Sequence, residues 1–92
     1  MNKQELITEV AKKGHLTKVE AKRAVEAFTE TVAEELAKGE KVQLVGFGTF
    51  EARERKARVG VNPGNPVEKI EIPAFTAPVF KAGKLLKDKV NE

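Results

Sequence analysis

The sequence has no cysteine, serine, tryptophan or tyrosine, and its aromatic residues are five phenylalanines. Without cysteine the chain forms no disulfide and offers no thiolate to a metal. The absence of serine and cysteine together removes the two commonest catalytic nucleophiles. The single histidine, His15, falls in a predicted turn, and the glutamates fall on solvated helix faces without a partner for acid–base work. We therefore predict no enzyme activity, no metal site and no cofactor.

Long hydrophobic runs are also missing. No apolar stretch approaches the roughly 20 residues that a membrane-spanning helix needs, and the polar start Met1–Glu5 does not resemble a signal peptide. We therefore expect a soluble, cytoplasmic protein without a membrane partner. At 92 residues the chain suits one domain with a modest core, and a core this small often needs a second chain to complete it.

The positive charge is concentrated in the second half of the chain. Residues 1–50 hold eight basic and eight acidic side chains, whereas residues 51–92 hold nine basic and six acidic ones. Positions 55 to 67 contain no acidic residue at all. This distribution favours a polyanionic partner, either a nucleic acid or an anionic membrane surface. A basic surface that binds nothing is the alternative interpretation.

The first half of the chain predicts two helices. Asn2 and Thr17 each precede a glutamate by three residues, which is the spacing of a capping box. Gly14 and Gly39 are the predicted stops, because glycine enters the left-handed conformation without steric cost. The apolar residues between these signals recur at helical spacing, and we interpret both helices as scaffold.

The second half predicts strands and a projecting ribbon. Alternating residues at 41–44, a glycine-flanked turn at Gly46–Gly48 and a strand from Thr49 onward predict a hairpin. The apolar face of the second strand disappears after Ala52, so the ribbon over residues 53–69 cannot pack on a core. We expect it to project into solvent as an arm, with a turn-forming cluster at its tip. A ribbon of this kind is marginally stable alone, and we expect it to be mobile without a ligand and ordered by binding.

Two runs of residues carry a specific pattern. The first comprises Gly46-Phe47-Gly48-Thr49-Phe50, then Arg55, Arg58, Gly60, Asn62, Pro63 and Asn65. The second comprises Phe80-Lys81-Ala82-Gly83-Lys84, with Leu86 and Lys87. Together they resemble the signature of the HU/IHF family of bacterial DNA-binding proteins, and the similarity extends over essentially the whole chain.

The resemblance implies an α+β fold that forms an intertwined homodimer. It implies two N-terminal helices, a three-stranded antiparallel sheet with a protruding β-ribbon arm, and a short C-terminal helix. Residues 1–92 then form one domain with a helical dimerisation base at 1–39 and saddle strands at 40–52 and 70–80. The arm covers 53–69 and the last helix 81–91. Six residues are assigned to the dimer core: Phe28, Leu36, Leu44, Phe47, Phe50 and Phe80. Stacking of Phe47, Phe50 or Phe80 on single-stranded bases is the alternative.

The predicted function is binding and bending of double-stranded DNA with little regard for sequence, as a nucleoid-associated protein. Arginines on a ribbon can contact phosphates and enter the minor groove, where base pairs are poorly distinguished. Pro63 is rigid and apolar, which suits a wedge between base steps; a simple turn proline is the alternative. The resemblance implies further contacts by Lys3 and by lysines near the last helix. The predicted DNA-binding residues are Lys3, Arg53, Arg55, Lys56, Arg58, Asn62, Pro63, Asn65, Lys81, Lys84 and Lys87.

Two features depart from the family pattern. Val61 stands where the family often has a basic residue, and Pro66-Val67 adds about one residue to the tip. Two other functions remain open at this point. One is an IHF-like subunit of a heterodimer that prefers certain sequences through DNA shape; the other is a dimeric module whose basic arms meet an acidic protein or a membrane.

Overall fold

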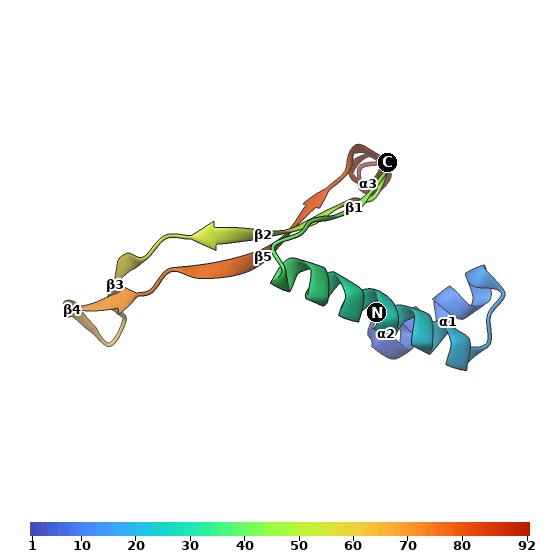
Figure 1. The fold of residues 1–92 in the computed structure, drawn as a ribbon, viewed down its shortest axis with the longest axis horizontal. Helices are drawn as coiled ribbons and strands as arrows, with labels where there is room; N and C mark the ends of the chain where they lie inside the picture. The colour runs from blue at the N-terminus through green and yellow to red at the C-terminus, as the bar shows by residue number, and fades with distance from the viewer. The chain divides into compact units, whose positions relative to one another are not determined.

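The computed structural model describes residues 1–92, apart from the side chains of Asn62 and Pro66. The chain forms two compact units, Met1–Glu35 and Leu36–Glu92. Its secondary structure, shown in Figure 1, agrees with the predicted α+β class. In chain order the elements are α1 (Lys3–Gly14), α2 (Lys18–Ala37), β1 (Val42–Leu44), β2 (Gly48–Arg55), β3 (Arg58–Asn62), β4 (Asn65–Ile72), β5 (Phe75–Ala82) and α3 (Lys84–Val90).

Both long helices begin at the predicted capping residues. The side-chain oxygen of Asn2 accepts a hydrogen bond from the Glu5 N–H at 2.9 Å. Before α2, Thr17 Oγ1 accepts from the Glu20 N–H at 3.1 Å, and the Thr17 N–H donates to Glu20 Oε1 at 2.9 Å. These bonds satisfy N–H groups that the first helical turn leaves without partners. The hydrogen bond from the Thr17 backbone, followed by that from its side chain, lowers the pKa of Glu20.

The end of α1 differs from the prediction. Gly14 is the last helical residue, and His15 takes the left-handed conformation at φ 54° instead. The His15 N–H bonds to the carbonyls of Ala11 and Lys12, which closes the helix. A residue with a side chain can occupy this region at modest cost, so the helix runs one residue further than the glycine rule indicates. Gly39, by contrast, has φ 82° after α2, as predicted.

The first unit packs α1 against α2 around a small core. Ile7 and Ala11 of α1 are buried with Ala21 of α2, and Val10 and Val25 pack at the edge of this cluster. Two of the three buried side chains in this cluster are alanines, which leave little apolar area to remove from water, and Val32 of α2 is the other buried hydrophobic residue described in this unit. This unit therefore has only a thin core of its own.

The second unit contains a three-stranded antiparallel sheet in the order β1-β2-β5. Strand β1 pairs only with Gly48–Phe50 of β2, whereas β5 pairs with the whole of β2, from Gly48 opposite Ala82 to Arg55 opposite Phe75. The sheet therefore narrows to two strands beyond Phe50. The turn between β1 and β2 places Gly46 at φ 86°, a conformation that favours glycine.

One face of this sheet carries a phenylalanine cluster. Phe50 and Phe80 are directly opposed on β2 and β5, and their ring centroids are 4.8 Å apart. The ring centroid of Phe47 is 5.4 Å from that of Phe80. Gly48 completes the arrangement, because a Cβ at this position would lie 2.5 Å from both the Phe80 ring and the Lys81 carbonyl oxygen. Three of the six residues assigned to the dimer core thus meet within one chain.

Strands β3 and β4 form a separate two-stranded sheet, the predicted ribbon arm. The pairing starts at Arg58 opposite Ile72 and ends with Asn62 opposite Asn65, around a turn at Pro63 and Gly64. The register shifts between Val61 and Asn62, because these neighbours on β3 pair with Lys69 and Asn65, which are four positions apart on β4. Residues 66–68 are thus the unmatched part of β4, and the extra length noted in the sequence is taken up there.

The observed boundaries differ from the predicted ranges at three points. Arg53–Arg55 belong to β2 rather than to the arm, because backbone pairing with β5 continues past the last apolar side chain at Ala52. Residues 70–72, expected in the saddle, extend β4. The last helix begins at Lys84 instead of 81, since β5 keeps its pairing to Ala82 and Gly83 is the N-cap.

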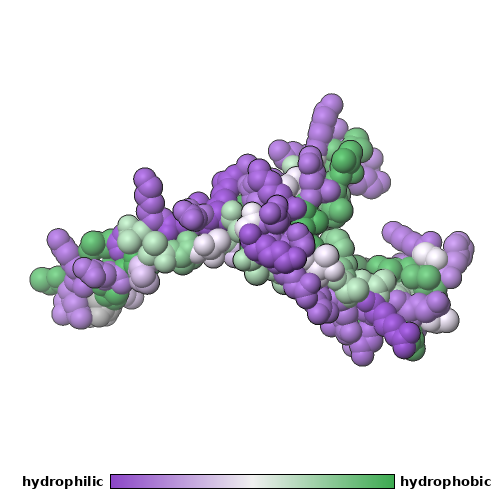
Figure 2. Space-filling model, viewed as in Figure 1, coloured by the Kyte–Doolittle hydropathy of each residue, from purple (hydrophilic) through white to green (hydrophobic). Residues whose placement is uncertain are grey.

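Many large hydrophobic side chains remain exposed on both units. Phe28 is 42% exposed, Phe47 46% and Phe80 40%, whereas Leu36 and Leu44 are half-buried. Hydrophobic residues coloured green reach the visible surface in Figure 2. Within the described residues no large side chain is fully buried. The single chain therefore leaves much apolar area in contact with water.

Candidate nucleic-acid interface

The three-stranded sheet has one apolar face and a second face, here called the polar face, that carries charged and polar residues together with Ala77 and Val79 of β5. Side chains alternate between the faces along a strand, and directly paired residues share a face. Phe50 and Ala52 of β2 therefore lie on one face, while Thr49, Glu51 and Arg53 lie on the other. Lys81 of β5 is opposite Thr49, which places it on the polar face too. The strand register thus gathers basic groups on one side of the sheet.

Glu51 lies at the centre of that polar face and is only 7% exposed. Its Oε1 atom is 2.9 Å from both Nε and Nη2 of Arg53 and 3.2 Å from Lys81 Nζ, and its Oε2 atom is 3.6 Å from Lys41 Nζ. Hydrogen bonding by Lys81 is the largest influence and lowers the pKa of Glu51, and Arg53 acts in the same direction against the effect of burial. We call these four residues the Glu51 cluster.

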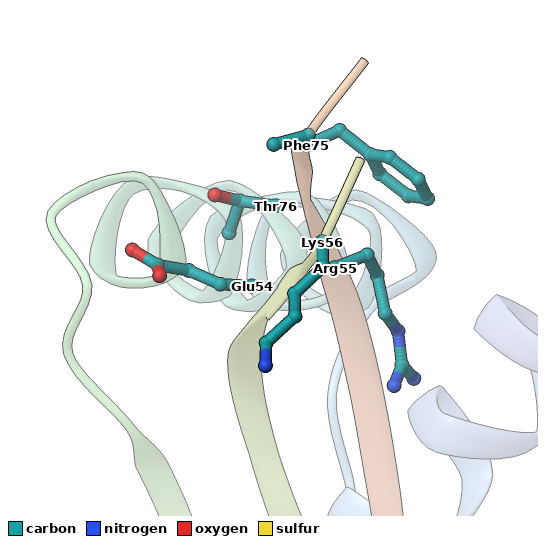
Figure 3. Close-up of a pocket in the computed structure, with 6 residues that line it drawn as sticks. Glu54, Arg55, Lys56, Phe75 and Thr76 are labelled. Carbon is teal, nitrogen blue, oxygen red and sulfur yellow. The ribbon is translucent and has the colours of Figure 1, made fainter. Parts of the chain in front are cut away.

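The basic residues at the end of β2 occupy the base of the arm. Arg55 is opposite Phe75 in the last pair of the β2–β5 ladder, and both are exposed. A small pocket here is lined by Glu54, Arg55, Lys56, Ala74, Phe75 and Thr76. Figure 3 shows Arg55 and Lys56 extending in different directions from the strand, with the Phe75 ring on the Arg55 side. Cations are thus available on both sides of the ribbon.

The arm itself presents exposed basic and apolar groups. Arg58 starts β3 and is exposed, and Pro63 is exposed in the turn at the tip. The Asn65 side chain accepts a hydrogen bond from the Val67 N–H at 3.3 Å, so it stabilises the tip turn as well as being a predicted DNA ligand. Val61 is 59% exposed. The role predicted for the Asn62 side chain lies outside the described residues.

The remaining predicted DNA ligands lie outside the arm. Lys84 and Lys87 are exposed on α3, and Lys81 is in β5 rather than in the last helix. Lys3, at the start of α1, forms an ion pair with Glu26 of α2 at 3.3 Å. The structure therefore places Lys81 with Arg53 in the Glu51 cluster, and places Lys3 in the other compact unit.

Lys41 contributes to the site although it is not among the predicted DNA ligands. The residue immediately precedes β1, where alternation marks it as polar but gives no sign of its partner. Its partner Glu51 is ten positions later, and only the β1–β2 register brings the two side chains together. The signal available in the sequence was the glutamate itself, an acidic residue on a strand face otherwise rich in bases.

No group of three or more His, Asp or Glu side chains that could hold a metal ion occurs among the described residues. Of the helices described, none has the length and apolar character needed to cross a membrane.

Comparison with known proteins identifies the family. Residues 1–91 match the family described as "Bacterial DNA-binding protein". The chain is 64% identical to the DNA-binding protein HU of Clostridium pasteurianum over 92 residues, which is the full length of both chains. It is 63% identical to the corresponding protein of Lactococcus lactis over 90 residues, or 98% of each.

Solved structures agree with this assignment. The chain resembles HU of Anabaena in a cocrystal with DNA, with a TM-score of 0.91 and 53% identity over 98% of this chain and 97% of that one. It also resembles HU of Thermotoga maritima, with a TM-score of 0.68 and 43% identity over 98% of each chain. The match covers helices, sheet and arm together, and the chain belongs to the bacterial DNA-binding protein family that includes HU.

Proposed function

We propose that this protein binds double-stranded DNA as a homodimer and bends it with little sequence preference. The observation that carries the proposal is the two-stranded arm, which has arginines at its base, no acidic residue from 55 to 67 and an exposed proline at its tip. The likeness to an HU chain solved with DNA supports the same function. As part of the same proposal, the protein acts in the cytoplasm, where it is bound to the DNA of the nucleoid.

The homodimer accounts for the exposed apolar residues. Phe28, Phe47 and Phe80 are each at least 40% exposed in the single chain, and burial of such side chains is the main favourable term in association. We propose that they form a shared core with Leu36, Leu44 and Phe50, and that the two compact units act together as one domain. Pairing would also double the net charge of +3 and present two arms.

In the proposed complex, the basic residues contact phosphate and Pro63 enters the minor groove between base steps. Arg55, Lys56 and Arg58 lie at the base and start of the arm, where they can reach the backbone on either side of the groove. Lys3, Lys84 and Lys87 extend the contact along the flanks. Neutralising phosphates releases condensed counterions, so affinity must fall steeply with salt.

A salt titration tests the function and separates it from the alternatives. Binding of several unrelated duplexes is measured by gel shift from low to physiological salt. Similar affinities that fall together with salt are expected. One strongly preferred duplex would indicate an IHF-like reader of sequence, which the relatives named HU at 59–64% identity do not favour. Failure to bind any duplex at low salt would overturn the proposal.

The wedge is tested by replacing the tip proline. Pro63→Ala removes the rigid ring that unstacks a base step, so we expect a smaller bend in the bound duplex while phosphate contacts persist. The bend angle is measured by energy transfer between dyes at the duplex ends. Val67→Ala, another exposed change near the tip, serves as the control. Equal angles for Pro63→Ala and the native chain would rule out the wedge.

A further inference from the structure

Glu51 stands out because it is an acidic residue inside a surface that the proposed function assigns to DNA. It is the only buried charged or polar side chain in the described part of the chain, at 7% exposure. Its strand neighbours Thr49 and Arg53 face the same side of the sheet. A carboxylate in this position opposes DNA binding by simple repulsion, so its presence requires another reason.

The geometry of the Glu51 cluster supplies that reason. Lys41 comes from the residue before β1, Arg53 from β2 and Lys81 from β5, so three separate segments send a cation to one carboxylate. Arg53 and Lys81 share Oε1, and Lys41 approaches Oε2. Without the carboxylate, three like charges would face one another across the sheet. One negative charge against three positive ones still leaves the cluster cationic.

A DNA phosphate offers the same chemistry as the Glu51 carboxylate. Both are anions with oxygens that accept hydrogen bonds from guanidinium and ammonium groups. The three cations remain partly exposed, at 40% for Arg53, 58% for Lys81 and 69% for Lys41, so an incoming phosphate can reach them. Each bond that a cation makes to phosphate must replace one that it already makes to Glu51.

We propose that Glu51 is an internal counter-anion that competes with DNA phosphate for Lys41, Arg53 and Lys81. In the free protein it holds these side chains together on the polar face of the sheet. On binding, the cations exchange the carboxylate for phosphate, so Glu51 limits both the affinity for DNA and its dependence on salt. This inference rests on the proposed function and assigns a regulating residue within the same surface.

The test compares Glu51→Gln with Glu54→Gln. Both substitutions remove one negative charge from β2, but Glu54 is exposed and lies on the opposite face of the strand. Affinity for one random-sequence duplex is measured by fluorescence anisotropy across a salt series. For Glu51→Gln we expect DNA binding about three- to tenfold tighter near 0.1 M salt. The slope of log K against log salt should steepen by about 0.9 for each cation released to bind phosphate.

Glu54→Gln should change affinity less, by about twofold or under, because long-range charge is screened. If Glu51→Gln binds no more tightly than Glu54→Gln, or binds more weakly than the native chain, the inference is wrong. In that case native binding at low salt still supports the proposed function, whereas loss of native binding would remove the function itself. The two failures are therefore distinguishable.

A second variant keeps the inference testable if the Glu51→Gln protein does not fold. Glu51→Asp keeps the charge but shortens the side chain by one methylene, so it loosens the hold on the cations without altering net charge. We expect its salt slope to lie between those of the native chain and Glu51→Gln, with helical circular dichroism unchanged. A slope equal to the native one in a folded Glu51→Asp protein would also overturn the inference.

Discussion

Glu20 and Glu51 are held ionised by their immediate neighbours. The bonds from Thr17 lower the pKa of Glu20, and Lys81 and Arg53 lower that of Glu51. A carboxyl whose pKa is lower in the folded state stabilises that state only while it is ionised. The stabilisation is complete above the pKa of the unfolded chain and disappears as the pH falls through the lower, folded value.

The lowered pKa values of Glu20 and Glu51 predict a loss of stability on acidification. As the pH is lowered past the ordinary glutamate pKa, the midpoint of urea unfolding should fall, and it should continue to fall until both carboxyls are protonated. The double variant Glu20→Gln/Glu51→Gln should show a shallower decline over the same range. A decline as steep as that of the native protein would mean that other groups control acid unfolding.

Thr17 stabilises the start of α2 through its side-chain hydroxyl. Thr17→Ala removes the hydroxyl that accepts the Glu20 N–H, and it should lower the free energy of unfolding by about 1 kcal/mol. Chemical denaturation measures the difference. Thr29 is an exposed threonine within α2, and its hydroxyl donates to the Glu26 carbonyl oxygen in a turn that is already formed. Thr29→Ala should therefore lower the free energy of unfolding by only about 0.5 kcal/mol or less. Equal effects would argue against the cap.

Sequence alone predicts residues whose partners are close in the chain. The caps at Asn2 and Thr17 follow from a three-residue spacing, and the structure confirms both. The Glu51 cluster could not be predicted in full, because Lys41 and Lys81 reach the carboxylate only through strand pairing. The end of α1 shows a second limit of prediction from sequence. Glycine is only the preferred residue for the left-handed position after a helix, and here His15 adopts that conformation in place of Gly14.

At the level of elements, the β2–β5 ladder is the link between the phenylalanine cluster and the base of the arm. At Gly48 hydrogen is the only side chain that fits, because a Cβ there would lie 2.5 Å from the Phe80 ring and from the Lys81 carbonyl oxygen. Alternation and turn signals predicted the first hairpin and the ribbon, and the three-stranded sheet followed from the resemblance to the HU/IHF family. The ends of the strands could not be predicted from the side-chain pattern, because backbone hydrogen bonds continue where that pattern stops.

Gly48→Ala tests this packing. The added methyl group would contact the Lys81 carbonyl oxygen and the Phe80 ring at 2.5 Å, so the strands must separate. We expect a loss of about 1–3 kcal/mol in the free energy of unfolding. Gly14→Ala is the matched control, because the new Cβ meets only the Leu16 side chain at 3.4 Å and alanine favours a helix. A stable Gly48→Ala protein would show that the ladder adapts.

At the scale of the whole molecule, one chain does not bury its own hydrophobic residues. The resemblance to HU/IHF predicted the fold and the family, and the apolar residues assigned to a shared core remain in part exposed in the single chain. What the residues themselves could not specify is how two copies interlock, since that depends on surfaces assembled from distant segments.

Dimerisation predicts a stability that depends on protein concentration. Burial of Phe28, Phe47 and Phe80 between two chains would couple folding to association, so the thermal midpoint should rise as the protein is concentrated. Phe47→Ala should lower the midpoint and shift the mass toward that of one chain in light scattering. A native protein that unfolds at the same temperature at every concentration and has the mass of 10.1 kDa would contradict the dimer.

The ribbon that carries the arm is interrupted near its middle. Ladder pairing stops at Arg55 opposite Phe75 and resumes at Arg58 opposite Ile72, and Pro73 lacks the N–H that a continuous ladder would require. In the part of the chain that the structure describes, no backbone hydrogen bond joins residues 56–57 to residues 73–74, so the outer ribbon can rotate about its own length relative to the inner one without breaking a ladder bond. We therefore expect this joint to act as a swivel, which would let the same tip follow grooves of different pitch and curvature.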